Sequence, residues 1–127
     1  MPLPEQTELT AKHVVDAAVK IHSALGPGLL ESVYEKCLGI ELAKRDVDYD
    51  RQVSVPIVYE GVAVEPGLRI DLIANKCVVV ELKSSEKLLP VHEAQLLTYL
   101  KLSGMRLGLL LNFNVALMKQ GIRRIIL

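Results

Sequence analysis

Hydrophobic residues recur at helical spacing in the first part of the chain. From residue 7 to residue 25 they follow one another at steps of four, three and four, at Val14, Ala18, Ile21 and Leu25. This period is typical of a helix that buries one hydrophobic stripe. The pattern therefore predicts a helix over residues 7–25.

A second helix is predicted directly after the break at Gly26-Pro27-Gly28. It runs to about Arg45, and its hydrophobic stripe again has steps of three and four, at Leu30, Val33, Cys37 and Ile40. A different face of the same helix carries Glu31, Tyr34, Leu38 and Glu41. Residues three apart on a helix are neighbours, so Glu31 and Tyr34 are expected side by side, with Gly28 one turn earlier.

The middle of the chain changes to a period of two, which is typical of strands. Residues 52–59 alternate, and we predict an edge strand there because Pro56 has no N–H to donate to a neighbour. Residues 68–73 and 77–83 flank a turn at Asn75-Lys76 and predict an antiparallel hairpin. The valine run at 78–80 indicates a central strand that is covered on both faces.

The last third contains one more helix and one or two more strands. Pro90 suits a first helical turn, residues 91–102 have helical period, and Gly104 follows as a stop signal. Residues 107–111 have the length of a buried strand, and residues 122–127 are a further candidate. The element order predicts an α/β (α+β) fold with helices on the faces of a mixed sheet. A doubly wound nucleotide-binding fold is disfavoured, because the glycine-rich segment joins two helices.

Composition limits the organisation and the location of the protein. The 127 residues are 50% hydrophobic and 24% charged, so we expect one folded domain over residues 1–127. No apolar run is long enough to span a membrane and the N-terminal segment lacks signal-peptide features, which indicates a cytoplasmic protein. The two cysteines, Cys37 and Cys77, are interpreted as reduced thiols. The high aliphatic content also predicts a homodimer that covers part of the apolar surface.

The formal net charge is zero, which by itself argues against binding to nucleic acid. The distribution is uneven, however. No acidic residue follows Glu93, whereas five basic residues do: Lys101, Arg106, Lys119, Arg123 and Arg124. An ordinary solvated surface explains such a run about equally well, so it does not decide between partners.

Three charges interrupt the strands where hydrophobic residues are expected. Asp71 lies within one strand of the hairpin, and Glu81 and Lys83 lie on one face of the other. Buried charges must be paired or bound to a metal, and proteins usually retain them at functional sites. Asp71 shares the face of Glu81 only if the hairpin loop has an odd number of residues, for example three.

If these side chains meet, two carboxylates lie beside an ammonium group. Oxygen ligands with open positions suit Mg²⁺ or Mn²⁺, and Lys83 can orient a water for attack on phosphorus. This arrangement indicates phosphodiester hydrolysis, although from these residues alone a surface ion pair between strands is equally plausible. The helix at 91–102 adds a polar stripe of His92, Gln95 and Tyr99 that can contact nucleic acid. A solvated helix face explains that stripe at least as well.

The same residues carry a resemblance to a known family. Residues 28–34, with Gly28, Glu31 and Tyr34, match the pattern that names the GxxExxY family. Asp71, the Glu81-Leu82-Lys83 triplet and residues 95–99 resemble the core motifs of the PD-(D/E)XK nuclease superfamily. The similarity continues through Asn112-Phe113 and residues 121–124 and so spans nearly the whole chain.

The resemblance implies a restriction-endonuclease-like core, a central mixed sheet flanked by helices. It implies that Asp71 and Glu81 are the principal metal ligands, with Glu31 as an accessory acidic ligand and the main-chain carbonyl of Leu82 as a further one. Lys83 would be the cation that orients the water. Gln95 and Tyr99 would correspond to the QxxxY element of RecB-type nucleases, which contacts the substrate. Ile70 stands where the superfamily's name has proline.

Gly28 and Tyr34 are expected to support this site without taking part in the reaction. Gly28 would permit a tight junction between helices, and the Tyr34 hydroxyl would fix a neighbouring element beside Glu31. The resulting hypothesis is a divalent-metal-dependent nuclease acting on nucleic acid, with DNA favoured as substrate. The alternative is a catalytically silent module on the same fold that binds nucleic acid or protein.

Overall fold

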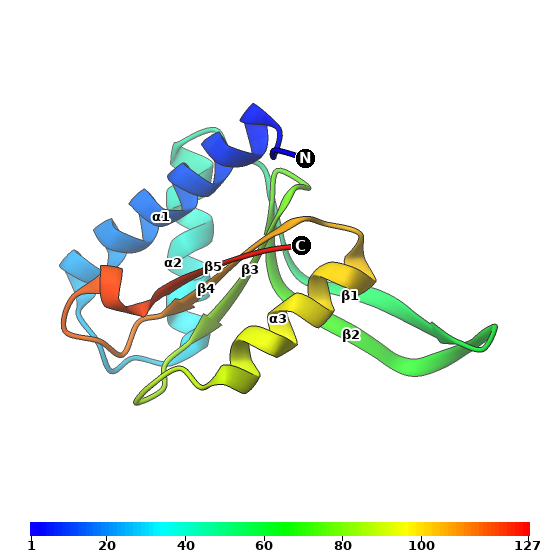
Figure 1. The fold of residues 1–127 in the computed structure, drawn as a ribbon. Coiled ribbons are helices and arrows are strands. Elements are labelled where there is room, and N and C mark those ends of the chain that lie inside the picture. The colour runs from blue at the N-terminus through cyan, green and yellow to red at the C-terminus, as the bar shows by residue number, and fades with distance from the viewer.

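The computed structural model describes all residues from 1 to 127. It contains one five-stranded sheet in the order β1-β2-β3-β4-β5, in which only β3 and β4 are parallel. The expected α+β fold with a mixed sheet is confirmed (Figure 1). The elements are α1 (Glu5–Leu25), α2 (Glu31–Lys44), β1 (Tyr49–Tyr59), β2 (Val62–Ala74), β3 (Val78–Lys83), α3 (Pro90–Ser103), β4 (Leu107–Asn112), the 3₁₀ helix η1 (Met118–Gly121) and β5 (Ile122–Ile126).

The α3 helix is the crossover between the two parallel strands, β3 and β4. Parallel neighbours require such a long connection, whereas the antiparallel pairs are joined by shorter segments. Pro90 starts the helix, and Gly104 ends it in a left-handed conformation with φ of 76°, as the sequence predicts. None of the helices is long and apolar enough to cross a membrane.

Helices cover both faces of the sheet, and each face has its own hydrophobic core. The α1 and α2 helices pack on one face and α3 on the other (Figure 1). Along β3 the side chains alternate between the two cores: Val78, Val80 and Leu82 belong to the first, and Val79 to the second. Cys37 and Cys77 are free thiols at the margin of the first core. β3 is therefore the central strand, and its side chains pack into both cores.

The buried face of α2 differs from the predicted one. The predicted stripe is largely exposed, with Leu30 at 74% and Ile40 at 56% of their full exposure, while Tyr34, Leu38 and Leu42 are completely buried. Both faces of this helix carry hydrophobic residues at helical spacing, so periodicity alone does not identify the face that meets the sheet. The correction matters for the site, because the buried face also carries Glu35, which contacts Arg51 and Gln52 of β1.

Tyr34 connects α2 to the rest of the structure. Its ring stacks on Phe113, which follows β4, with ring centroids 4.2 Å apart. Its hydroxyl donates a hydrogen bond to the carbonyl of Gly26 at 2.6 Å and accepts one from the N–H of Leu29 at 3.2 Å. Gly28, between them, has φ of 98°, a left-handed conformation that favours glycine. Tyr34 therefore fixes the segment that joins α1 to α2.

Replacement of this hydroxyl tests its contribution to stability. We expect Tyr34→Phe to retain the stacking on Phe113 but to leave the two main-chain partners unpaired, which lowers the free energy of unfolding by about 1–2 kcal/mol. Urea titration measures the difference. Ser23→Ala is the control, because Ser23 is exposed and its hydroxyl forms no hydrogen bond within the protein, and it should have no effect. Equal stability of the two variants would contradict the structural role of the Tyr34 hydroxyl.

Candidate active site

The hairpin between β2 and β3 brings Asp71 and Glu81 together. Its last main-chain pair is Ala74 with Val78, so the loop has three residues, 75–77. The odd loop length that the sequence hypothesis requires is therefore present. Continuing the register by one pair beyond Leu72 and Val80 places Asp71 opposite Glu81. Both side chains accordingly enter the same region of the structure.

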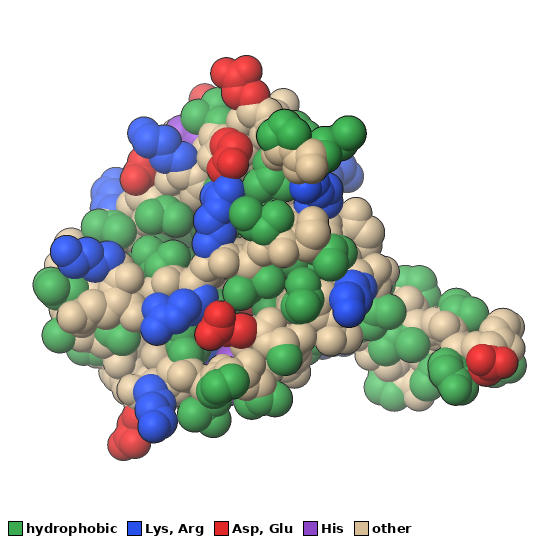
Figure 2. Space-filling view, in the orientation of Figure 1, with side chains coloured by type: hydrophobic (Ala, Val, Ile, Leu, Met, Phe, Trp, Pro, Cys, Tyr) green, Lys and Arg blue, Asp and Glu red, His purple; other side chains and the backbone are tan.

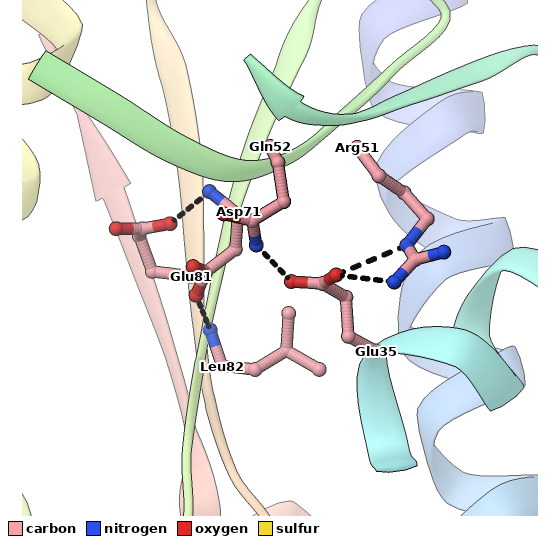
Figure 3. Close-up of polar contacts among 6 residues, drawn as sticks. All are labelled: Glu35, Arg51, Gln52, Asp71, Glu81 and Leu82. Atoms are coloured by element: carbon pink, nitrogen blue, oxygen red, sulfur yellow. Dashed lines mark hydrogen bonds and ion pairs between the residues drawn. The ribbon is translucent and has the colours of Figure 1, made fainter. Parts of the chain in front are cut away.

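Beyond Leu72 and Val80, the β2 and β3 main chains diverge, and carboxylates replace the missing ladder bonds. The N–H of Asp71 donates to Oε2 of Glu81 at 2.8 Å, and the N–H of Leu82 donates to Oδ2 of Asp71 at 2.9 Å (Figure 3). We call this region, formed by Asp71, Glu81 and Leu82, the strand fork. Each bond occupies one oxygen of a carboxylate, so the second oxygen of each has no main-chain partner there.

An irregularity in β1 lies opposite the strand fork. Gln52 has φ of 51°, and the register passes from the Arg51–Leu72 pair to the Val53–Ile70 pair without a regular pair between them. Ile70 belongs to the core under α3, whereas Leu72 belongs to the core under α1 and α2. The alternation of β2 therefore reverses at Asp71. This reversal is the local reason that β2 turns away from β3 and opens the fork.

Burial and mutual repulsion disfavour two negative charges in the strand fork. Glu81 is 8% exposed, and burial followed by the charge of Asp71 raises its pKa to about 8. Burial also raises the pKa of Asp71 above its ordinary value. The positive charge of Lys83 lowers both pKa values but does not outweigh burial. A divalent cation would stabilise the doubly ionised pair.

Lys83 and Tyr99 face the carboxylate pair from two elements. Lys83 forms no ion pair within 4.0 Å, yet its charge acts on both carboxyl groups. Tyr99 of α3 is half-buried, and burial, then the charges of Glu81 and Asp71, raise the pKa of its hydroxyl. The hydroxyl of Tyr99 therefore lies within electrostatic reach of the fork.

The carbonyl of Leu82 also points into the strand fork. The N–H and C=O of one strand residue point to the same side, and the N–H of Leu82 meets Asp71. The carbonyl of the next residue, Lys83, points the other way and accepts from the N–H of Phe113. The side chain of Leu82 is buried in the first core. Only its main chain is available to a ligand.

Neither Glu31 nor Gln95 forms a hydrogen bond with the pair. Glu31, at the start of α2, accepts a hydrogen bond through Oε2 from the N–H of Ser84 at 3.2 Å, and Ser84 Oγ donates to the carbonyl of Leu29 at 2.8 Å. Gln95 is exposed on α3 and forms no hydrogen bond within the protein. No three His, Cys, Asp or Glu side chains are close enough together to hold a metal ion. Glu31 thus contacts the end of β3 and not the two carboxylates.

The structure adds one carboxylate that the sequence analysis missed. Glu35 is 5% exposed and accepts hydrogen bonds from Arg51 at 2.8 and 3.0 Å and from the Gln52 amide at 2.7 Å (Figure 3). Its charge is one cause of the raised pKa of Asp71. It follows Glu31 by one helical turn, and that i, i+4 spacing is the available sequence signal. Because Gln52 lies opposite the fork, Glu35 connects α2 to the irregularity in β1.

Comparison with known proteins identifies the family. A family model of the PD-(D/E)XK nuclease superfamily matches residues 8–125. The chain belongs to this superfamily, and its mixed sheet flanked by helices is consistent with a restriction-endonuclease-like fold. No curated protein sequence and no solved structure matches the chain.

The raised pKa of Glu81 gives a pH dependence of stability. Its carboxyl binds a proton more tightly in the folded state, so this stabilisation is present below the usual value of 4.5 and is lost as pH rises toward 8. We expect the metal-free protein to melt at progressively lower temperature from about pH 5 to about pH 8, and Glu81→Gln to flatten this slope. Thermal melts in EDTA measure it. Glu86→Gln, at an exposed position after β3, should leave the slope unchanged. An unchanged slope in Glu81→Gln would refute the assignment.

Proposed function

We propose that the protein is a divalent-metal-dependent nuclease that hydrolyses phosphodiester bonds, with DNA as the favoured substrate. The observation that carries the proposal is the placement of Asp71 and Glu81 opposite each other in the strand fork, on a chain of the PD-(D/E)XK nuclease superfamily. Membership of its GxxExxY group, on Gly28, Glu31 and Tyr34, is part of the same proposal.

The donors in the strand fork fit Mg²⁺ or Mn²⁺. They are all oxygens, and hard cations of this size bind one or two carboxylates and retain waters or substrate oxygens at the other positions. We assign Asp71, Glu81 and the carbonyl of Leu82 as the ligands. Glu31 is an accessory ligand, and to bind the cation it would have to give up the hydrogen bond that it accepts from the N–H of Ser84. When bound, such a cation lowers the pKa of a bound water and stabilises negative charge on the phosphate.

The protein's own side chains orient the substrate and the water. The Lys83 ammonium, which has no competing ion pair, is free to hold the attacking water or a phosphate oxygen beside the carboxylates. The Tyr99 hydroxyl donates to a phosphate oxygen from the α3 side. Gln95, one turn earlier and exposed, contacts the substrate outside the fork.

The C-terminal basic segment contributes less to binding than its composition suggests. Arg106 donates to the carbonyls of Met1 and Pro2, and Arg124 pairs with Glu8 at 2.7 Å. These side chains fasten the N-terminal segment to β5, at the edge of the sheet away from β2. Binding to nucleic acid therefore depends mainly on the strand fork and α3. The homodimer and the cytoplasmic location also remain proposals.

Cleavage assays test the proposed activity. Single-stranded, double-stranded and branched DNA, and RNA, are incubated with Mg²⁺, Mn²⁺ or EDTA. We expect cleavage only with metal, and a loss of at least about a hundredfold in Asp71→Asn, Glu81→Gln and Lys83→Ala. Asp50→Asn, at an exposed position of β1, is the control and should retain activity.

Two outcomes of this assay would contradict the proposal. Cleavage in EDTA, or cleavage by Glu81→Gln at the wild-type rate, would refute the assigned ligands. DNA binding by the wild-type protein without cleavage under any of these conditions would identify a catalytically silent binding module.

Metal titration distinguishes the contribution of Glu31 to metal affinity from that of the carboxylates of the strand fork. We expect Glu81→Gln to abolish binding of Mn²⁺, followed by calorimetry, and Glu31→Gln to weaken it by about tenfold, because an accessory ligand adds to a site that already exists. Glu86→Gln, exposed after β3, is the matched control. Wild-type affinity in Glu31→Gln would remove Glu31 from the ligand set.

A further inference from the structure

The distal parts of β1 and β2 form a two-stranded arm that leaves the body (Figure 1). We define the arm as residues 53–68. β2 pairs with β3 only at residues 72–74, and β1 is the edge strand, so neither outer edge of the arm is hydrogen-bonded within the chain. Isolated two-stranded ribbons are at best marginally stable in water. An arm of this kind is therefore expected to pack against something else.

One face of the arm continues the core under α3 into solvent. Val55, Ile57 and Tyr59 alternate onto this face of β1 and pair with Leu68, Val64 and Val62 of β2, with a register shift between Val55 and Ile57. We call these six residues the arm stripe. Leu68 is buried in that core, whereas the outer members are exposed, with Tyr59 at 71%, Val62 at 63% and Val64 at 45%. Contiguous apolar surface that extends a core outward is typical of a protein interface.

The charge of the arm disfavours nucleic acid as its partner. Between Arg51 and Arg69 the only charged side chains are Glu60 and Glu65. Figure 2 shows hydrophobic side chains over the projecting arm, and an acidic side chain at its end, with no Lys or Arg on the visible part. Beyond Arg69, which pairs with Ser54 at the base, phosphates would meet no cation and would be repelled by two carboxylates. The arm therefore suits a protein surface that is apolar and carries positive charge.

The base of the arm has these two properties. The α3 helix contacts β1, and its C-terminal end lies beside the base of the arm (Figure 1). Its last turn carries Lys101, which is exposed and forms no ion pair. The apolar stripe begins at the same place. The arm is thus acidic at its tip and flanked by a cation at its base, which makes its two ends complementary in charge.

We propose that the arm is the interface of a homodimer, in which two arm stripes pack face to face and antiparallel about a two-fold axis. This arrangement puts Glu60 of each copy over the base of the other, near Lys101, and covers both exposed stripes at once. At about 3.3 Å per residue, residues 53–59 span roughly 23 Å. Each copy contributes its arm stripe and the side chains of Glu60 and Lys101 to this contact.

Sedimentation velocity between about 1 and 100 µM tests the proposal without reference to nuclease activity. We expect a dimer for the wild-type chain and at least about a tenfold weaker association for Tyr59→Lys. Ile40→Lys is the matched control: it adds the same charge at a 56% exposed position in the other uncovered apolar region, on α2. Circular dichroism and thermal melts establish that each variant is folded. A wild-type monomer over the whole range, or a dimer broken by Ile40→Lys and not by Tyr59→Lys, would overturn the proposal.

A charge exchange tests the antiparallel arrangement. Glu60→Lys and Lys101→Glu should each weaken the dimer. The double variant should regain most of the lost affinity, because the lysine at position 60 of one copy then faces the glutamate at position 101 of the other. Failure of the double variant to regain affinity would overturn the arrangement. Since none of these residues belongs to the strand fork, loss of the dimer and loss of nuclease function are distinguishable.

Discussion

The structure depends on two reciprocal hydrogen bonds in which carboxylates take the place of strand pairing. Where β2 leaves β3, the N–H of Asp71 is satisfied by Glu81 and the N–H of Leu82 by Asp71. Without these bonds two main-chain donors near the sheet would lack partners, and without the divergence the carboxylates would have no open space before them. The side chains that we assign to metal binding therefore also complete the sheet. Because the carboxylates accept these main-chain bonds, the acidic residues have a structural role at positions where burial raises their pKa values.

The sequence predicted those features of the site that follow from periodicity. Strand residues alternate with a period of two, so a three-residue loop was enough to bring Asp71 and Glu81 to one place. Tyr99, four residues after Gln95, lies on the polar stripe of α3, where the charges of both carboxyl groups act on it. The buried face of α2 was not predictable in this way, because Leu30 and Ile40 on one face and Tyr34 and Leu38 on the other have the same hydrophobic period. Glu35 was missed for a related reason. Its partners, Arg51 and Gln52, come from another element, and no local pattern encodes that pairing.

Long-range contacts also determine what the charged side chains do in the folded protein. The basic C-terminal segment is continuous in sequence, yet Arg106 and Arg124 bind the N-terminal segment, at the opposite side of the sheet from β2. The fold therefore uses part of the charge of this segment to hold two chain ends together. Lys83, a single charge without an ion pair, acts on both carboxyl groups of the strand fork. The electrostatic field of individual side chains at the site is therefore more informative about function than the summed charge of a chain segment.

The same irregularity that opens the strand fork also produces the arm. At Gln52 and Asp71 the alternation of β1 and β2 reverses, so the hydrophobic residues beyond this point face the α3 side. The α3 helix covers the base of that face and ends there, and Tyr59 and Val62 continue past it into solvent. The sequence prediction placed this strand at residues 68–73, whereas β2 begins at Val62, and so it did not reveal the arm. If the arm pairs with that of a second copy, one distortion accounts for both the open site and the surface that joins two such sites.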